Sequence, residues 1–237
     1  MKALLLAAGL GTRLRPAVGA LPKAMVPVGG TPLLERTVRW LGANDVRDLA
    51  INLHYLPAAI TSHFGDGREF GVEIRYSYEP ELLGTAGALY PLRDWLREGD
   101  QPFLVVYGDN LITLDVSRLL DAHARGGAMA TVAVFEREDV SASGVAELNE
   151  EGWVVRFVEK PRSGQTSSKW VSAGFLACNP ALLDEIQPGF LDFGRDVLPS
   201  LVASGHGVCS YRMGAGETLG WIDTPNDLRR LDEGLKQ

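Results

Sequence analysis

The sequence of 237 residues predicts an α/β fold, with a mixed, mostly parallel sheet between helices and a smaller β-rich lobe. The first observation is that apolar strand patterns alternate with helix patterns through the first half, which is typical of βαβ units. The second is a shift to short strands between about residues 137 and 190. The third is an ordinary globular composition, with 46% hydrophobic and 22% charged residues.

The first half opens with a continuous apolar run, residues 2–8, which ends in glycines and predicts a buried strand. Thr31 as an N-cap and Pro32 at the first helical position predict a helix to about Gly42. Further strands are expected over residues 49–53, 72–78, 103–107 and 131–135. Further helices are expected over residues 57–64, from the end of the third strand through Leu96, and over residues 116–124.

The second half is richer in strands. Residues 144–148 and 153–159 predict a hairpin around Asn149–Gly152, and residues 171–177 predict a further strand. Helices are expected over residues 180–186 and 194–203. Thr224 and Pro225 repeat the cap-plus-proline start and predict a last helix to about Leu235. We expect one domain over residues 1–237, with a lobe at about 137–190 inserted into the main sheet.

Charge and cysteine usage exclude several classes of protein. Lys and Arg total 23 and Asp and Glu total 30, so the net charge is -7, which argues against a nucleic-acid surface but permits one basic pocket. Two cysteines, Cys178 and Cys209, are too few for a disulfide framework or a cysteine zinc site. No stretch approaches the roughly 20 apolar residues of a membrane span. We therefore expect no nucleic-acid partner, no membrane and a cytoplasmic location.

The segment LAAGLGTRLRP, residues 6–16, is the sharpest local motif. Glycines after a buried strand let consecutive backbone N–H groups form a nest for an anion, and Arg13 adds a charge suited to phosphate. Leu14 stands where the dinucleotide fingerprint has its third glycine, and the Gly-Lys-Ser/Thr of a P-loop is missing. A glycine turn beside a surface arginine is the alternative that this motif alone leaves open.

Lys23 follows in the segment PKAMVP, between a proline turn and an apolar run. Alone it is typical of a solvated loop lysine. Together with Arg13 it places two cations near one glycine loop, and ligands of open α/β sheets bind at the strand carboxyl ends where that loop lies.

These two segments, LAAGLGTRLRP and PKAMVPVGGTPLLE, resemble the signature of the sugar-phosphate nucleotidyltransferases. Further marks of the family follow in order: LLGTAGAL at 82–89, YGDN at 107–110, VEKP at 158–161, SAGFLACNP at 172–180, DFGRDVLP at 192–199 and GWIDTP at 220–225. The resemblance covers nearly the whole chain. It implies a Rossmann-like three-layer sandwich, forming one nucleotidyltransferase domain over residues 1–237.

The resemblance implies transfer of a nucleotidyl group from a nucleoside triphosphate to a sugar 1-phosphate, with release of pyrophosphate. The attacking phosphate oxygen is already an anion, so this chemistry needs charge compensation and positioning but no general base. Arg13 is our candidate for the β- and γ-phosphates and Lys23 for the α-phosphate or the sugar phosphate. Asp109 ends an apolar strand and Asp223 precedes a helix, where either could be a cap; the resemblance makes both Mg²⁺ ligands.

The resemblance also assigns the binding residues. Nucleotide-binding residues are expected to be Leu6, Ala8, Gly9, Gly11, Thr12, Arg13, Glu79 and Gly84. Sugar-phosphate-binding residues are expected to be Lys23, Asn110, Gly144, Glu159 and Lys160. A carboxylate at Glu79 can accept from N1–H and N2–H₂ of guanine, and the phrase EPELLGTAGAL resembles guanylyltransferases of mannose or heptose 1-phosphates. GTP is therefore favoured.

Two other functions stay open. One is a uridylyl- or thymidylyltransferase acting on a hexose or amino-sugar 1-phosphate. The other is a catalytically silent regulatory subunit, although Arg13, Lys23, Asp109 and Asp223 are all present. No hexapeptide repeat follows the last helix, so we expect a catalytic domain without the β-helix of many relatives. The oligomeric state stays open, with a homodimer as one candidate.

Overall fold

The structure is a computed structural model, and it describes residues 1–12, 14, 18–222 and 224–234. Two compact units make up the chain. The first contains residues 1–82, 106–113 and 218–237, and the second contains residues 83–105 and 114–217. The strand β6 (Phe103–Tyr107) runs across the division.

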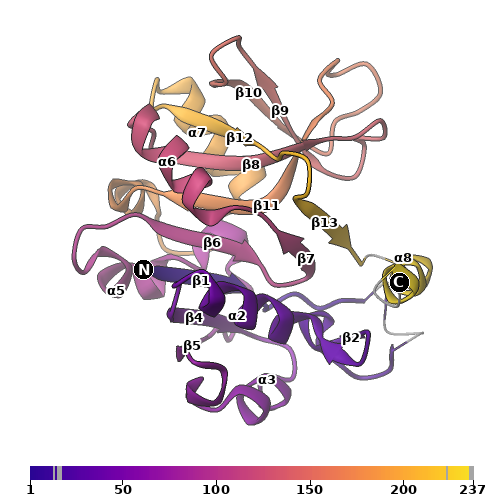
Figure 1. Ribbon diagram of the computed structural model, residues 1–237. Helices are drawn as coiled ribbons and strands as arrows, with labels where there is room; N and C mark the ends of the chain where they lie inside the picture. The colour runs from indigo at the N-terminus through magenta and orange to yellow at the C-terminus, as the bar shows by residue number, and fades with distance from the viewer. Residues whose placement is uncertain (13, 15–17, 223, 235–237) are drawn as a thin grey trace. The chain divides into compact units, whose positions relative to one another are not determined.

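A parallel sheet is the centre of the first unit. Strand β4 (Asp48–Leu53) lies between β1 (Lys2–Leu6) and β5 (Glu73–Tyr78) and pairs in parallel with both, as Figure 1 shows in indigo and purple. The run of buried residues in β1 and β4 fits a strand covered on both faces. Parallel strands end at the same edge of a sheet, so the segments after β1, β4 and β5 begin close together.

Short elements surround this sheet. They are η1 (Lys23–Met25), β2 (Pro27–Val28), β3 (Thr31–Pro32), α2 (Leu33–Ala43), α3 (Pro57–Phe64), η2 (Arg68–Phe70), β7 (Asn110–Thr113), β13 (Thr218–Trp221) and α8 (Pro225–Gly234). The predicted helix cap at Thr31 is wrong. Thr31 and Pro32 pair with Val28 and Pro27 as a small antiparallel ladder, and α2 starts one residue later without a side-chain cap.

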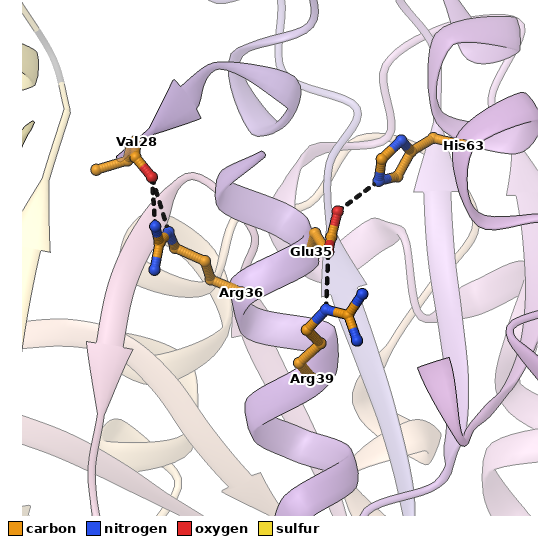
Figure 2. A network of polar contacts seen from close by, with 5 residues as sticks. All are labelled: Val28, Glu35, Arg36, Arg39 and His63. Carbon is orange, nitrogen blue, oxygen red and sulfur yellow. Dashed lines mark hydrogen bonds and ion pairs between the residues drawn. The ribbon is translucent and has the colours of Figure 1, made fainter. Parts of the chain in front are cut away.

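Figure 2 shows the polar contacts that side chains of α2 make with β2 and α3. Arg36 donates from Nε and Nη2 to the Val28 carbonyl, at 2.9 and 2.6 Å, which holds β2 against the helix. On the same helix Glu35 accepts from Arg39 Nε at 2.7 Å and from His63 Nε2, at the end of α3, at 2.8 Å. Burial opposes the charge of Glu35, but these two donors outweigh it, and the pKa of Glu35 is lowered.

A mostly antiparallel sheet, with strands in the order β10-β9-β11-β8-β12, is the centre of the second unit (Figure 1, pink to orange). Its strands are β8 (Ala130–Glu136), β9 (Gly144–Leu148), β10 (Val154–Glu159), β11 (Trp170–Cys178) and β12 (Val208–Arg212). Its helical elements are α4 (Gly84–Gly87), η3 (Tyr90–Leu92), α5 (Arg93–Arg97), α6 (Val116–Gly126), η4 (Pro180–Glu185), η5 (Phe193–Val197) and α7 (Leu198–Ala203).

The predicted fold class is confirmed, since helices flank a mixed sheet whose main pairings in the first unit are parallel. The differences are local. The helix predicted through Leu96 is three short pieces with Pro91 inside the second, and the helix predicted from Gly194 starts as a π-helical turn, η5. Strands β7, β12 and β13 were not predicted. Within the described part of the chain, no helix is long and apolar enough to span a bilayer.

Candidate active site

The glycine loop of the first unit follows directly after β1. Ala7 and Ala8 are each 5% exposed, whereas Gly9 and Thr12 are exposed. Gly11 has φ +56°, and a Cβ on it would lie 2.9 Å from the Cβ of Lys23. A side chain at this position would be strained and crowded, so glycine is required for the loop to lie against the Lys23 turn. The predicted phosphate-binding residue Arg13 lies outside the described residues.

Lys23 and Asp109 form an ion pair beside this loop. Lys23 opens η1, Asp109 stands between β6 and β7, and Nζ lies 2.7 Å from Oδ2. The exposed fractions of the two side chains are 13% and 37%. The backbone N–H of Gly108 donates to the Leu6 carbonyl at 3.0 Å, which fixes the carboxylate next to the end of β1. A predicted phosphate ligand and a predicted metal ligand are therefore in direct contact.

Asp109 fits a magnesium site by its chemistry. A carboxylate has about four acceptor positions, so it can accept from Lys23 and still coordinate an ion. Magnesium uses one or two protein carboxylates and completes its octahedron with phosphates and waters. Among the described residues no three His, Cys, Asp or Glu side chains cluster as ligands. The second predicted metal ligand, Asp223, lies outside the described residues. Asn110, which was predicted to bind the sugar phosphate, is the first residue of β7 and pairs with Trp221 of β13.

Glu79 is almost completely buried where β5 ends. Its exposed fraction is 1%, and its Oε1 accepts from Nδ2 of Asn52 at 2.8 Å. Asn52 is 2% exposed, and its Oδ1 accepts from the backbone N–H of Ala7 at 2.7 Å. Asn52 was not predicted as a site residue. The feature of the sequence that could have indicated it is the single asparagine inside the apolar strand LAINL. The predicted base-reading residue is thus joined to the glycine loop through one amide.

The second unit carries Glu159 and Lys160. Glu159 ends β10, with a side chain 20% exposed, and its Oε1 lies 3.6 Å from Lys160 Nζ. Burial raises the pKa of Glu159, Asp192 adds to the rise, and Lys160 and Arg195 oppose it. Lys160 has φ +50° and is 56% exposed.

Two glycines make room for the Glu159 carboxylate. A Cβ on Gly144 would lie 2.9 Å from Oε2, and a Cβ on Gly194 would lie 2.5 Å from the same atom. Gly144 also opens β9, directly opposite Glu159 in the ladder. The predicted residues Gly144, Glu159 and Lys160 are therefore brought together. Gly194 was missed, although it lies in the DFGRDVLP motif.

Asp192 organises the segment that contains Gly194. Its Oδ1 accepts from the N–H groups of Gly194 and Arg195, at 2.9 and 3.0 Å, and its Oδ2 accepts from Thr85 Oγ1 at 3.0 Å. Thr85 Oγ1 in turn accepts from the Phe193 N–H at 2.8 Å. The predicted nucleotide-binding residue Gly84 precedes Thr85, with φ +77° at the start of α4. Single-turn π-helices such as η5 are frequent at functional sites.

Comparison with known proteins defines the class of this chain. The Nucleotidyl transferase family profile matches residues 2–230. The chain is 36% identical over 205 residues to the mannose-1-phosphate guanyltransferase of Schizosaccharomyces pombe, covering 85% of this chain and 56% of that protein. It is 35% identical over 217 residues to the UTP–glucose-1-phosphate uridylyltransferase of Synechocystis, covering 86% and 56%. The structure of HddC from Yersinia pseudotuberculosis superposes with a TM-score of 0.83 at 23% identity, covering 99% of both chains.

This chain belongs to the nucleotidyl transferase family, as its motifs predicted. It spans a little over half the length of the two relatives matched by sequence. The likeness to HddC shows a shared fold.

Proposed function

We propose that this chain transfers a nucleotidyl group from a nucleoside triphosphate to a sugar 1-phosphate and releases pyrophosphate. The observation that carries the proposal is the Lys23–Asp109 pair, at 2.7 Å, beside the glycine loop of a chain from this family. The relatives matched by sequence are named as transferases of this reaction class, which supports the assignment.

In this reaction a phosphate oxygen of the sugar 1-phosphate bonds to the α-phosphorus. The bond from that phosphorus to the oxygen bridging to the β-phosphate breaks, and the electron pair leaves with pyrophosphate. Lys23 is assigned to compensate the negative charge of the α-phosphate or of the incoming sugar phosphate, and Arg13 that of the β- and γ-phosphates. Backbone N–H groups of Gly9, Gly11 and Thr12 are assigned to the phosphate oxygens. No group on the chain has to remove a proton, because the nucleophile is already an anion.

Asp109 and Asp223 are assigned as the protein ligands of Mg²⁺. When bound there, the ion would neutralise part of the negative charge of the triphosphate. The 2.7 Å contact from Lys23 keeps the Asp109 side chain in one position, so the ligand is oriented before nucleotide arrives.

GTP is the proposed nucleotide, with Leu6, Ala8 and Gly84 expected to line the base. The two relatives, at 36% and 35% identity, are named for guanine and for uracil nucleotides, so they do not separate the bases. The chemistry of Glu79 supports guanine. A buried carboxylate offers acceptors alone, which suits the N1–H and N2–H₂ donors of guanine, whereas a pyrimidine edge presents both a donor and an acceptor.

A mannose- or heptose-type 1-phosphate is the proposed acceptor. Glu159 can accept hydrogen bonds from two neighbouring sugar hydroxyls, and Gly144 leaves space for its carboxylate. Lys160 is assigned to the sugar phosphate, and Asn110 to a hydroxyl by its place in the YGDN motif.

A pyrophosphate-release screen tests the proposal. GTP, UTP, dTTP, ATP and CTP are each paired with mannose, glucose, glucosamine and heptose 1-phosphates, with Mg²⁺ present. We expect release with GTP and a mannose or heptose 1-phosphate. Asp109→Asn should abolish it, while the control Asp184→Asn, which removes an exposed ion pair to Arg97, should not. Release with UTP or dTTP instead would overturn the guanine assignment, and no release from any pair would overturn the reaction.

A further inference from the structure

The hydroxyl of Thr85 lies in the segment predicted to bind nucleotide, but both of its hydrogen bonds go to the segment that leads into η5. Its Oγ1 accepts from the N–H of Phe193 at 2.8 Å and donates to Oδ2 of Asp192 at 3.0 Å. A backbone N–H can only donate, so the hydroxyl accepts there and its own proton is left for the carboxylate. These residues all belong to the second unit.

The backbone of the predicted nucleotide segment is anchored separately. The N–H groups of Ala86 and Gly87 donate to the Leu191 carbonyl, at 2.9 and 3.1 Å. The Leu191 N–H donates to the Leu83 carbonyl at 2.9 Å. The two backbones are also in close contact, since a Cβ on Gly84 would lie 2.4 Å from the Leu191 carbonyl oxygen. Removal of the neighbouring threonine hydroxyl would leave these contacts in place, so the position of Gly84 does not depend on it.

Asp192 uses its other carboxylate oxygen to hold the first turn of η5. Oδ1 accepts from the N–H groups of Gly194 and Arg195, at 2.9 and 3.0 Å, and such N–H groups have no partner inside their own helix. The bond from Thr85 to Oδ2 restricts rotation of the same carboxylate. The Thr85 hydroxyl therefore fixes the side chain that caps η5 and also the N–H of Phe193, the residue before Gly194.

Gly194 is the point where this network meets the proposed sugar site. A Cβ on Gly194 would lie 2.5 Å from Oε2 of Glu159, so its backbone forms one wall of the space that the carboxylate occupies. In the part of the chain that the structure describes, the ion pair of this carboxylate, to Lys160 at 3.6 Å, uses Oε1. The position of Oε2 is consequently set by packing, and a shift in the first turn of η5 would change it.

We propose that Thr85 and Asp192 are positioning residues for the sugar site. The Thr85 hydroxyl holds Asp192, and Asp192 holds the turn that sets Gly194 against the carboxylate of Glu159. This inference rests on the proposed function, since it takes Glu159 as the acceptor of the sugar hydroxyls. It has a specific consequence: a side chain inside the predicted nucleotide segment acts on the sugar 1-phosphate and not on the triphosphate.

Removal of the hydroxyl at nearly constant size tests this consequence. In Thr85→Val the Asp192 carboxylate and the Phe193 N–H each lose a partner. The substrates are GTP and mannose 1-phosphate, or the pair that the pyrophosphate-release screen selects. We expect KM for the sugar 1-phosphate to rise about fivefold or more, while KM for the triphosphate stays within about twofold of wild type. Thr85→Ser, which keeps the hydroxyl, should hold both KM values within about twofold of wild type.

Further variants separate positioning from a general loss of stability. Thr131→Val is the matched control: it removes a buried hydroxyl 3.0 Å from Nδ1 of His123 in the same unit, and should lower Tm but leave both KM values unchanged. Asp192→Ser keeps an oxygen that can cap η5 but is too short to reach Thr85, so it should raise KM for the sugar 1-phosphate alone. In a Glu159→Gln background, Thr85→Val should raise that KM less than about twofold, because both substitutions affect one interaction.

The outcomes are separable. For Thr85→Val, an unchanged KM for the sugar 1-phosphate, equal rises in both KM values or a rise confined to the triphosphate overturns the positioning role and leaves the proposed function intact. An undiminished effect in the Glu159→Gln background does the same. If Thr85→Val lacks a cooperative thermal transition, Asp192→Ser decides by the same criteria. A wild type that releases no pyrophosphate with any pair overturns the proposed function and this inference with it.

Discussion

The charged site residues of the first unit pair with partners far away in sequence, whereas the charged pair Glu159 and Lys160 of the second unit consists of sequence neighbours. Lys23 and Asp109 are 86 residues apart, and Ala7 and Asn52 are 45 apart. In the second unit Glu159 and Lys160 are adjacent, and the carboxylate takes its place where Gly144 and Gly194 have no side chains. In the first unit, direct hydrogen bonds and an ion pair hold the polar groups in position. In the second unit, the absence of side chains at Gly144 and Gly194 leaves space for the Glu159 carboxylate.

The contrast is consistent with the two kinds of ligand in the proposed reaction. A triphosphate and a base present charges and donors at fixed positions, so preorganised partners on the protein contribute to catalysis and selectivity. A sugar presents several similar hydroxyls, and a carboxylate in a shaped space can accept from two of them. The units should consequently respond differently to substitution, the first through lost charges and bonds and the second through crowding.

Removal of the Lys23 charge should have the largest effect. Lys23→Met is expected to lower kcat by about 100- to 1000-fold, because a preorganised charge on the transferring phosphate is lost. The assay is pyrophosphate release at saturating substrates. Lys169→Met is the matched control, since it breaks an ion pair with Glu138 of the same 2.7 Å length at an exposed position. A kcat for Lys23→Met within threefold of wild type would remove Lys23 from the reaction.

Crowding of Glu159 should have the next largest effect. In Gly194→Ala the new Cβ would come to 2.5 Å from Oε2, so the carboxylate must shift. We expect KM for sugar 1-phosphate to rise by about tenfold, or roughly 1.4 kcal/mol, with KM for the triphosphate unchanged. Gly214→Ala, whose Cβ would have no neighbour nearer than 3.8 Å, is the control. Equal increases in both KM values would show that Gly194 does not act through the sugar.

In the first unit, neutralising Glu35 should lower stability. Glu35→Gln loses two charge-assisted bonds, and we expect the free energy of unfolding at pH 7 to fall by about 1 kcal/mol. The folded pKa is lowered, so this stability is present above the ordinary value of 4.5 and is lost as pH falls through the folded pKa. Urea unfolding between pH 3 and 7 measures it, with exposed Glu69→Gln as the control. A difference that stays constant down to pH 3 would contradict this account.

In the second unit, neutralising Glu159 should change the free energy of unfolding least, and should raise it, whereas neutralising Glu35 lowers it. The folded pKa is raised, so stability is fully present below 4.5 and is lost as pH rises through the folded pKa. Glu159→Gln should accordingly unfold at slightly higher urea than wild type at pH 7, with the difference vanishing in acid. The same variant should bind sugar 1-phosphate more weakly. A protein less stable than wild type at pH 7 would show that the charged form of Glu159 stabilises the fold.

The sequence by itself determined the fold class, the family and several element bounds. The strand at residues 103–107 and the helix at 57–64 lie where they were predicted, and Thr224 accepts from the Asp227 N–H at the start of α8. The glycine loop was also visible. All of these signals are local, because apolar periodicity, caps and glycine turns depend on residues a few positions apart.

Tertiary structure alone decided which polar groups meet. Strands β7 and β13 are four residues long, and their Thr113 and Thr218 hydroxyls meet across 105 residues, so periodicity could not reveal the pairing. Thr31 has the pattern of a helix cap, but the ladder with Val28 offered its backbone other partners. In the sequence, Asn52 is a polar residue inside an apolar strand and has no evident partner. The order of the strands, with β4 between β1 and β5, places the Ala7 N–H and the Glu79 carboxylate at the two ends of its amide.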